Sequence, residues 1–266
     1  MQQAVRAQLD PTRAEAAVGE LVALGAVDFE LVDDGTLHVL FPGPVPRAAV
    51  EAALGVPVVV APARFGDHGS TWLDPPRVFR AGPLTFAPAA LAARHPGAIV
   101  LDDAPGDASF GTGLHPTTQL VIEHLVDRPP EGLRVLDVGT GTGILALAAH
   151  ALGAREVWAF DDDARAVAQA ATNAERNRAT TVHAITRWPE LRGGADRVLA
   201  NIDDATLEAL ASPLVGALAS RATLVLSGVR ASRADEVERT FTRLGLHAIR
   251  RVELGGWVCL ELDASW

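Results

Sequence analysis

The sequence lacks most of the features that mark secreted, membrane-spanning or metal-clustering proteins. It has one cysteine, Cys259, among 266 residues, which excludes an intramolecular disulfide and a cysteine-based metal cluster. No stretch approaches the roughly 18 uninterrupted apolar residues of a membrane span, and the N-terminal segment has no apolar core of signal-peptide length. We therefore expect a soluble protein of the reducing cytoplasm, with no metal and no membrane partner, in which Cys259 packs as a small apolar side chain.

A surplus of basic charge is also missing. The 23 basic and 33 acidic residues give a net charge of −10, which argues against unspecific adhesion to nucleic acid. The five tryptophans and eight phenylalanines are not interleaved with basic residues in the way that single-stranded nucleic acid requires. We expect no direct nucleic-acid partner, whereas an acidic surface would suit a basic protein substrate.

The first 62 residues show the pattern of a small α+β domain. The order is strand, helix, strand, strand, helix, strand, with strands expected at 4–9, 27–32, 36–41 and 56–61 and helices at 11–25 and 46–54. Asp33-Asp34-Gly35 is a hairpin signal between the second and third strands. This is the order of a ferredoxin-like unit, and because it holds no catalytic constellation we expect residues 1–62 to recognise the substrate.

The remainder divides into a connector and a larger domain. Residues 63–109 are rich in proline and glycine, and we expect a connector with two short strands at 84–87 and 98–101. Residues 110–266 alternate between apolar strand runs and helical runs. Expected helices are 118–126, 143–152, 163–176, 204–218 and 231–244; expected strands are 133–138, 155–160, 181–185, 197–202, 222–227, 246–252 and 256–262. This alternation predicts an α/β, doubly wound, mostly parallel seven-stranded sheet of Rossmann-like type, closed by an antiparallel hairpin.

The most informative stretch is residues 135–143, Val-Leu-Asp-Val-Gly-Thr-Gly-Thr-Gly. A buried strand here breaks into a glycine turn, through which a backbone can pass close to a ligand, and the next helix offers its N-terminal amides. Asp161 ends the following strand, eighteen residues after the last glycine, where a carboxylate can accept both ribose hydroxyls. The two features together predict a nucleoside-binding crevice.

The spacing of the glycines favours one class of nucleoside. The turn is Gly139-x-Gly141-x-Gly143, so the third glycine comes one position too early for the dinucleotide fingerprint. Asp137 precedes the first glycine by two residues, and a carboxylate there suits a zwitterionic ligand end better than a pyrophosphate. We therefore expect S-adenosylmethionine rather than a nicotinamide dinucleotide.

Two further stretches carry candidate site residues. The segment Phe110–Thr118 (Phe-Gly-Thr-Gly-Leu-His-Pro-Thr-Thr) runs into a helix that Thr117 or Thr118 could cap, and it leaves His115 as a candidate site residue. Asn201 lies where the fourth parallel strand should end, which is the edge where such sheets bind ligands. The adjacent Asp203 and Asp204 fit better as helix caps.

These stretches together resemble the PrmA family, which methylates the large-subunit ribosomal protein L11. The matching segments are Phe110–Thr118, the glycine motif with Ile144-Leu145-Ala146, Asn173-Ala174-Glu175-Arg176-Asn177, Ala200-Asn201-Ile202, Leu226-Ser227-Gly228 and Trp257. The resemblance covers roughly residues 105–262 and implies that Thr118, Gly139, Asp161 and Asn201 contact S-adenosylmethionine. The chain departs from the family at Asp162-Asp163-Ala164, where Ile-Asp-Pro is usual, and in the connector, where Pro76 stands in place of a tryptophan and no lysine occurs.

The resemblance implies an S-adenosylmethionine-dependent N-methyltransferase that acts on lysine or α-amino groups of a ribosomal protein. In this interpretation Asn201 and His115 are the catalytic candidates, and Thr118, Asp137, Gly139, Gly141, Gly143, Asp161 and Asn201 bind the cofactor. Three alternatives stay open: a methyltransferase of another protein or of a small-molecule amine, a non-catalytic cofactor-binding protein of the same fold, and a nicotinamide dehydrogenase, which the glycine spacing disfavours.

Overall fold

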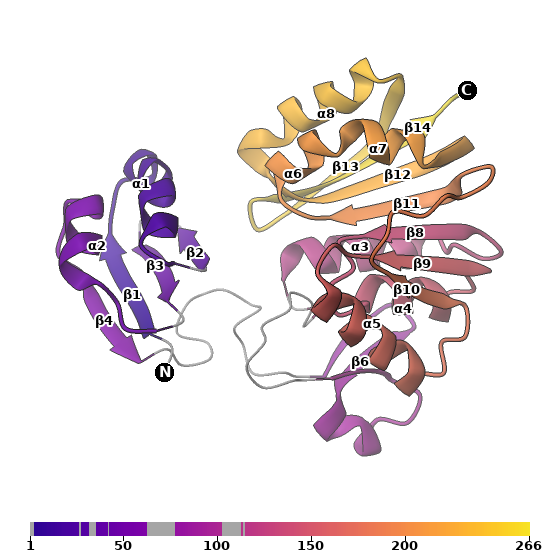
Figure 1. Ribbon diagram of the computed structural model, residues 1–266, viewed down its shortest axis with the longest axis horizontal. Coiled ribbons are helices and arrows are strands. Elements are labelled where there is room, and N and C mark those ends of the chain that lie inside the picture. Colours follow the sequence, from indigo (N-terminus) through magenta and orange to yellow (C-terminus); the bar gives the residue numbers. More distant parts are fainter. Residues whose placement is uncertain are drawn as a thin grey trace. The chain divides into compact units, whose positions relative to one another are not determined.

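The computed structural model describes residues 3–26, 28–31, 36–41, 43–62, 78–102, 113 and 115–266. The chain forms two compact units, Met1–Pro75 and Pro76–Trp266 (Figure 1). Several features named above lie outside the described residues: the hairpin turn 33–35, Pro76 of the connector, and residues 110–112 and 114 of the loop before the first helix of the large unit. Within the described residues, no helix combines the length and the apolarity that crossing a bilayer requires.

The first unit has the order of strands and helices along the chain that the sequence predicts. Its elements are β1 (Gln3–Gln8), α1 (Pro11–Ala23), β2 (Asp28–Leu31), β3 (Thr36–Phe41), α2 (Arg47–Leu54) and β4 (Val59–Pro62). The sheet order is β2-β3-β1-β4 with antiparallel neighbours, as in a split β-α-β unit. Alternate residues of β1 and β3, such as Val5 and Val39, are buried in one core with Leu21 of α1 and Leu54 of α2.

Part of the expected connector belongs to the second unit. Residues 78–102 form β5 (Phe79–Ala81), β6 (Leu84–Pro88), the 3-10 helix η1 (Ala89–Arg94) and β7 (Ile99–Leu101), which make a three-stranded sheet of order β5-β6-β7. The two strands expected here are confirmed, and β5 was not predicted. Leu84, Phe86, Ile99 and Leu101 are buried in the same core as the helices of the large sheet, so this segment is part of the folded domain.

The large sheet confirms the predicted α/β class. Its strands are β8 (Arg134–Val138), β9 (Glu156–Phe160), β10 (Val182–Ile185), β11 (Ala195–Asn201), β12 (Leu218–Arg230), β13 (Leu246–Leu254) and β14 (Trp257–Ala264). They lie in the order β10-β9-β8-β11-β12-β14-β13. In this order, the five strands from β10 to β12 are parallel to one another. Strand β14 is antiparallel to both β12 and β13. The sheet is therefore doubly wound and mostly parallel, with an antiparallel closing hairpin.

Helices cover the two faces of this sheet (Figure 1). They are α3 (Pro116–Asp127), α4 (Ile144–Ala151), α5 (Ala164–Arg176), α6 (Asp204–Ala209), α7 (Ala211–Gly216) and α8 (Ala234–Arg243), with the short 3-10 helix η2 (Ala231–Arg233) before the last. Buried residues of α3, α4 and α5 share one core, and those of α6, α7 and α8 share another. Layers of this kind place every strand-to-helix turn along the carboxyl edge of the parallel strands.

One expected helix is divided. The segment 204–218 was expected to be a single helix, but it forms α6 and α7, which meet at Leu210. Pro213 has no amide hydrogen, so it cannot donate to the carbonyl of Ala209, and its ring would clash with that carbonyl in a continuous helix. The prediction of a continuous helix was therefore wrong for a reason that the sequence contains.

An ion-pair cluster is buried between α3 and β14. Glu261 is 2% exposed, and its Oε1 accepts a hydrogen bond from Nη1 of Arg128 at 2.9 Å. Burial raises the pKa of Glu261, while Arg128 and Arg197 act in the opposite direction. His124 faces the same carboxylate, but burial, with Arg197, lowers its pKa to about 3, so it is neutral at ordinary pH. The arginines are therefore the charged partners of Glu261.

Candidate functional site

The topology has a switch point at the carboxyl end of β8. After β8 the chain adds β9 and β10 on one side, and it then crosses to add β11 on the other side. Ligands of doubly wound sheets bind at such a switch point, beyond the carboxyl ends of the strands. Gly139, Asp161 and Asn201 lie at the ends of β8, β9 and β11, so the structure brings these three predicted residues to one edge.

The glycine turn is required by its conformation and by its neighbours. Gly139, Gly141 and Gly143 have φ values of 72°, 54° and 82°, in the left-handed region that favours glycine. A Cβ on Gly139 would lie 2.3 Å from Cγ2 of Ile202, the residue after Asn201. Gly228, at a register shift in β12, meets the same residue: its Cβ would lie 2.2 Å from the Ile202 carbonyl oxygen. The ends of β8, β11 and β12 therefore approach each other more closely than side chains would allow.

Asp161 is tied to the glycine turn. Its Oδ2 accepts a hydrogen bond from the amide of Gly141 at 3.0 Å, and its Oδ1 accepts one from the amide of Asp163 at 3.0 Å. Asp163 caps α5 by accepting from the amide of Arg165 at 2.8 Å. Each carboxylate oxygen of Asp161 has further lone pairs, so the half-buried group can also accept hydrogen bonds from a ligand.

Asp137 is a fully buried acid with one unpaired oxygen. Its Oδ2 accepts a hydrogen bond from Oγ1 of Thr140 at 2.6 Å, while Oδ1 has no hydrogen-bond partner among the described residues. Burial raises the pKa of Asp137 to about 7, and the Thr140 hydroxyl and the backbone amide of Ala146 oppose this shift. An unpaired acceptor of this kind is costly unless a donor or a cation meets it.

The start of α3 is joined to the ends of β11 and β12. Nδ2 of Asn201 donates to Oγ1 of Thr118 at 3.2 Å, and Oγ of Ser227 donates to the carbonyl of Thr117 at 3.0 Å. Two of the predicted cofactor residues, Thr118 and Asn201, are therefore in contact across 83 positions of sequence. The expectation that Thr117 or Thr118 caps the helix is wrong, because the cap is the side chain of His115.

His115 is held in one tautomer by this cap. Its Nδ1 accepts from the amide of Thr117 at 3.3 Å and lies 2.7 Å from the Thr117 hydroxyl oxygen. Burial lowers the pKa of His115 to about 4, so the ring is neutral near pH 7 and carries its proton on Nε2. Trp257 meets the ring edge to face, with the centroids 5.0 Å apart. In this state His115 is a hydrogen-bond donor at Nε2 rather than a base.

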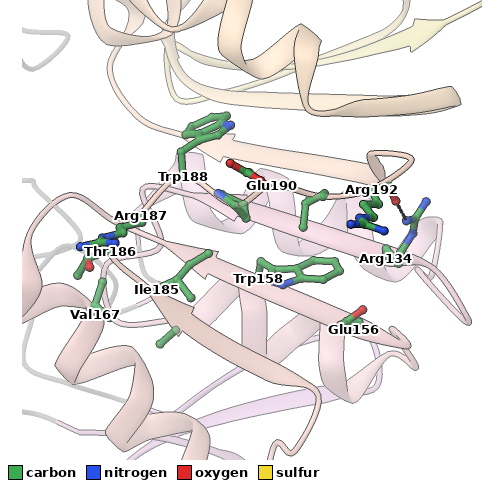
Figure 2. A pocket seen from close by; sticks show the side chains of 13 residues that line it. Arg134, Glu156, Trp158, Val167, Ile185, Thr186, Arg187, Trp188, Glu190 and Arg192 are labelled. Atoms are coloured by element: carbon green, nitrogen blue, oxygen red, sulfur yellow. Dashed lines mark hydrogen bonds between the residues drawn. The ribbon is translucent and has the colours of Figure 1, made fainter.

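A surface cavity of about 830 Å³ extends from Arg134 and Glu156, at the amino ends of β8 and β9, to residues 185–188 at the carboxyl end of β10 (Figure 2). Trp158 and Ile185 project into it from β9 and β10, and Trp188 and Arg192 approach it from the connection 186–194 (Figure 2). This connection contains no helix, so a strap of chain replaces the helix that would otherwise cover this part of the sheet. The strap is fixed at one end by Arg134, whose Nη1 donates to the carbonyl of Arg192 at 2.9 Å.

The cavity adjoins the site at one end. The ring of Trp188 packs edge to face on Phe160, with the centroids 5.2 Å apart, and Phe160 directly precedes Asp161. The amide of Asp161 donates to the carbonyl of Ile185 at 3.2 Å. Sequence reasoning did not find Trp188, which lies three residues after the end of β10.

Comparison with known proteins agrees with this geometry. The family model described as ribosomal protein L11 methyltransferase (PrmA) matches residues 70–265. Relatives of that name from Burkholderia orbicola (strain MC0-3) and Burkholderia pseudomallei (strain 668) are each 43% identical, over 166 and 169 residues. The alignments cover 62% and 63% of this chain and 54% and 55% of the relatives. The chain thus spans about half the length of these curated relatives.

Solved structures show the same fold. The ribosomal protein L11 methylase of Lactobacillus delbrueckii subsp. bulgaricus matches with a TM-score of 0.62 and 28% identity, covering 71% of this chain and all of that one. The tRNA m1G37 methyltransferase of M. jannaschii, at 10% identity, has a TM-score of 0.52 over 99% of both chains, which is a likeness of fold alone. From the match over residues 70–265, this chain belongs to the ribosomal protein L11 methyltransferase (PrmA) family.

Proposed function

We propose that this protein is an S-adenosylmethionine-dependent N-methyltransferase that methylates amino groups of ribosomal protein L11. The observation that carries the proposal is the assembly at the switch point, where Asp161 bonds the glycine turn and Asn201 bonds Thr118. Family membership supports the choice of cofactor and substrate.

The residues present fit this cofactor. The three glycines let the turn take a left-handed backbone close to its neighbours. Asp161 is placed to accept hydrogen bonds from the ribose hydroxyls, and the unpaired Oδ1 of Asp137 suits the ammonium of the methionine end. When bound, the sulfonium supplies an activated methyl group and a good leaving group. The protein therefore mainly needs to position the acceptor amine and to exclude water.

The cavity next to Asp161 suits the adenine ring. Because Asp161 is the proposed ribose ligand, the base attached to that ribose would lie towards the Thr186–Trp188 end of the cavity (Figure 2). Trp188 offers an aromatic edge and face there. Quenching of tryptophan fluorescence by S-adenosylmethionine should therefore be lost in Trp188→Phe and kept in Trp158→Phe.

The acceptor amine must reach the site without its proton. A lysine ammonium has a pKa of about 10.4 in water, so the site favours transfer by desolvating the amine. Nδ2 of Asn201 is used by Thr118, which leaves the amide oxygen of Asn201 as the acceptor that orients the amine N–H. Neutral His115, which caps the helix that carries Thr118, packs on Trp257. His115 thus assists by position and by its neutral charge rather than by taking the proton.

Residues 1–62 recognise the protein substrate in this proposal, and residues 110–266 bind the cofactor. The first unit has its own core and holds none of the proposed site residues. A separate core lets a small domain present a surface to a partner while the larger domain carries the chemistry.

Isothermal titration with Asp161→Asn tests the cofactor site. The amide keeps one acceptor for the Gly141 amide but removes the charge, so S-adenosylmethionine affinity should fall about thirtyfold, equivalent to about 2 kcal/mol. Asp163→Asn is the matched control, because an asparagine still caps α5 and the residue is not a proposed ligand. Equal affinities of the two variants would reject Asp161 as the ribose ligand.

The substrate is tested by methyl transfer to purified L11 from labelled cofactor. The chain contains no lysine, so any methyl-lysine recovered after acid hydrolysis comes from the substrate. Transfer to a different protein or to a small amine would support the alternative substrates. Cofactor binding without any transfer would indicate a non-catalytic protein of the same fold.

A further inference from the structure

Two asparagines at the end of α5, Asn173 within the helix and Asn177 at its C-cap, hold different parts of the large unit. The side-chain amide of Asn177 pairs with the backbone of Val100 in β7, in the way that a neighbouring strand would. Oδ1 of Asn177 accepts from the Val100 amide, and Nδ2 donates to the Val100 carbonyl, each at 2.7 Å. Asn173 instead joins two separate segments. Its Nδ2 donates to the carbonyl of Thr142 at 2.9 Å, and its Oδ1 accepts from the amide of Asp102 at 2.9 Å.

The bond to Thr142 fixes one peptide plane of the glycine turn. The carbonyl of Thr142 is held by Asn173, and the amide of Gly143, in the same peptide plane, donates back within the turn at 2.8 Å. A second side chain, that of Asp161, accepts a hydrogen bond from the amide of Gly141 in the same turn. Asp161 is itself a proposed ligand of the cofactor, whereas Asn173 is fully buried and uses both ends of its amide in bonds to the protein backbone.

We infer that Asn173 is a positioning residue for the cofactor: it holds the glycine turn in its binding conformation before the ligand arrives. Loss of this donor removes the side-chain hydrogen bond that fixes the Thr142–Gly143 peptide plane, so the turn would hold its conformation less firmly. The same side chain holds the amide of Asp102, so the turn and the end of β7 are fixed to one helix. This inference rests on the proposed function, because it assumes that the turn binds S-adenosylmethionine.

Asn173→Asp is the sharpest perturbation. The carboxylate keeps an acceptor for the Asp102 amide, but it removes the donor and sets an anionic oxygen against the Thr142 carbonyl. Asn177→Asp is the matched control, because it makes the same change one turn along the same helix without touching the glycine turn. If Asn173→Asp does not fold, the neutral Asn173→Ser takes its place with the same expected results.

Titration calorimetry should show S-adenosylmethionine and its demethylated product binding about tenfold more weakly to Asn173→Asp, and within about twofold of wild type to Asn177→Asp. Hydrogen exchange without cofactor should be faster at amides 139–143 in Asn173→Asp only. Thermal unfolding of both variants separates these effects from a general loss of stability.

The outcomes distinguish this inference from the proposed function. Wild-type protein that binds no S-adenosylmethionine would reject the proposed function itself. If wild type binds, unchanged affinity and unchanged exchange of residues 139–143 in Asn173→Asp would overturn the positioning role. Equal losses of affinity and of melting temperature in the Asn173 and Asn177 variants would also overturn it, because the role would then be structural only.

Discussion

The affinity for S-adenosylmethionine should rise with pH because Asp137 must ionise to meet the cofactor's ammonium. Burial raises the pKa of this carboxyl to about 7 in the cofactor-free protein, so it is protonated through most of the range below neutrality. A cation placed next to its unpaired Oδ1 favours the charged form and lowers the pKa. Binding below about pH 7 should therefore release a proton.

The size of the effect follows from the fraction ionised. With a pKa of about 7, the ionised fraction falls about twentyfold between pH 7.5 and 5.5, so the affinity should fall about twentyfold, close to 1.8 kcal/mol. The range stops at pH 7.5 because an α-amino group, such as that of the cofactor, titrates near 8. His115 is neutral throughout this range and does not contribute.

The raised pKa of Asp137 also makes the folding stability depend on pH. A carboxyl whose folded pKa lies above its unfolded value of 3.8 contributes stability that is fully present below that value and is lost as pH rises through about 7. Without cofactor, the stability difference between wild type and Asp137→Asn should therefore shift in favour of the variant between pH 5.5 and 7.5. Urea unfolding at the two pH values measures this shift.

Titration calorimetry at pH 5.5, 6.5 and 7.5, in two buffers of different ionisation enthalpy, measures both affinity and proton release. Wild type should show the twentyfold slope and proton release, and Asp137→Asn should bind weakly with almost no slope. The reasoning is refuted if Asp137→Asn keeps the wild-type slope, or if wild type takes up protons on binding.

Three further outcomes are expected. Gly139→Ala should abolish measurable cofactor binding by calorimetry, because its Cβ would lie 2.3 Å from Ile202. Gly132→Ala, with a similar φ of 71° and no atom within 4 Å of the new Cβ, should bind the cofactor normally. Equal affinities of the two variants would contradict the clash with Ile202. Glu261→Gln should lower unfolding stability in urea by about 2 kcal/mol without changing cofactor affinity, and an affinity change would contradict a purely structural role. The fragment 78–266 should bind cofactor but lose L11 methylation; an undiminished rate would remove the recognition role from the first unit.

Most elements of the fold could be predicted from local patterns of the sequence. Alternating apolar runs predicted every strand of the large sheet, because period and strand-end residues are local properties. The glycine turn and Asp161 were predicted for the same reason, since each follows a readable strand. The division of helix 204–218 could also have been read from Pro213, whose effect reaches only four residues back.

Contacts between distant segments were not readable in the same way. The sequence suggested a threonine cap for α3, but the buried His115 ring reaches the cap position, and the threonines are bonded by Asn201 and Ser227 instead. Asp204 was expected to be a cap, and it pairs with Arg230 at 3.0 Å while Asp203 caps α6. In each case, local helix-capping propensity is similar for the two candidate residues, and tertiary packing determines which side chain caps the helix.

The asparagines at the end of α5 are the clearest example of a role that depends on contacts between distant segments. Asn173 and Asn177 were recognised only as a family motif, because asparagine has no strong preference for helix interiors. Their purpose depends on β7 and the glycine turn, which lie 71 and 31 positions away from Asn173 in the sequence. No helical pattern contains that information.

Transfer of labelled methyl groups to purified ribosomal protein L11 tests the central claim most directly. Full-length wild type with S-adenosylmethionine should produce methylated lysine or α-amine in L11, detectable by mass spectrometry, and Asp161→Asn should reduce the rate at low cofactor concentration and recover at high concentration. If wild type binds S-adenosylmethionine but L11 stays unmethylated, the assignment of this substrate is contradicted.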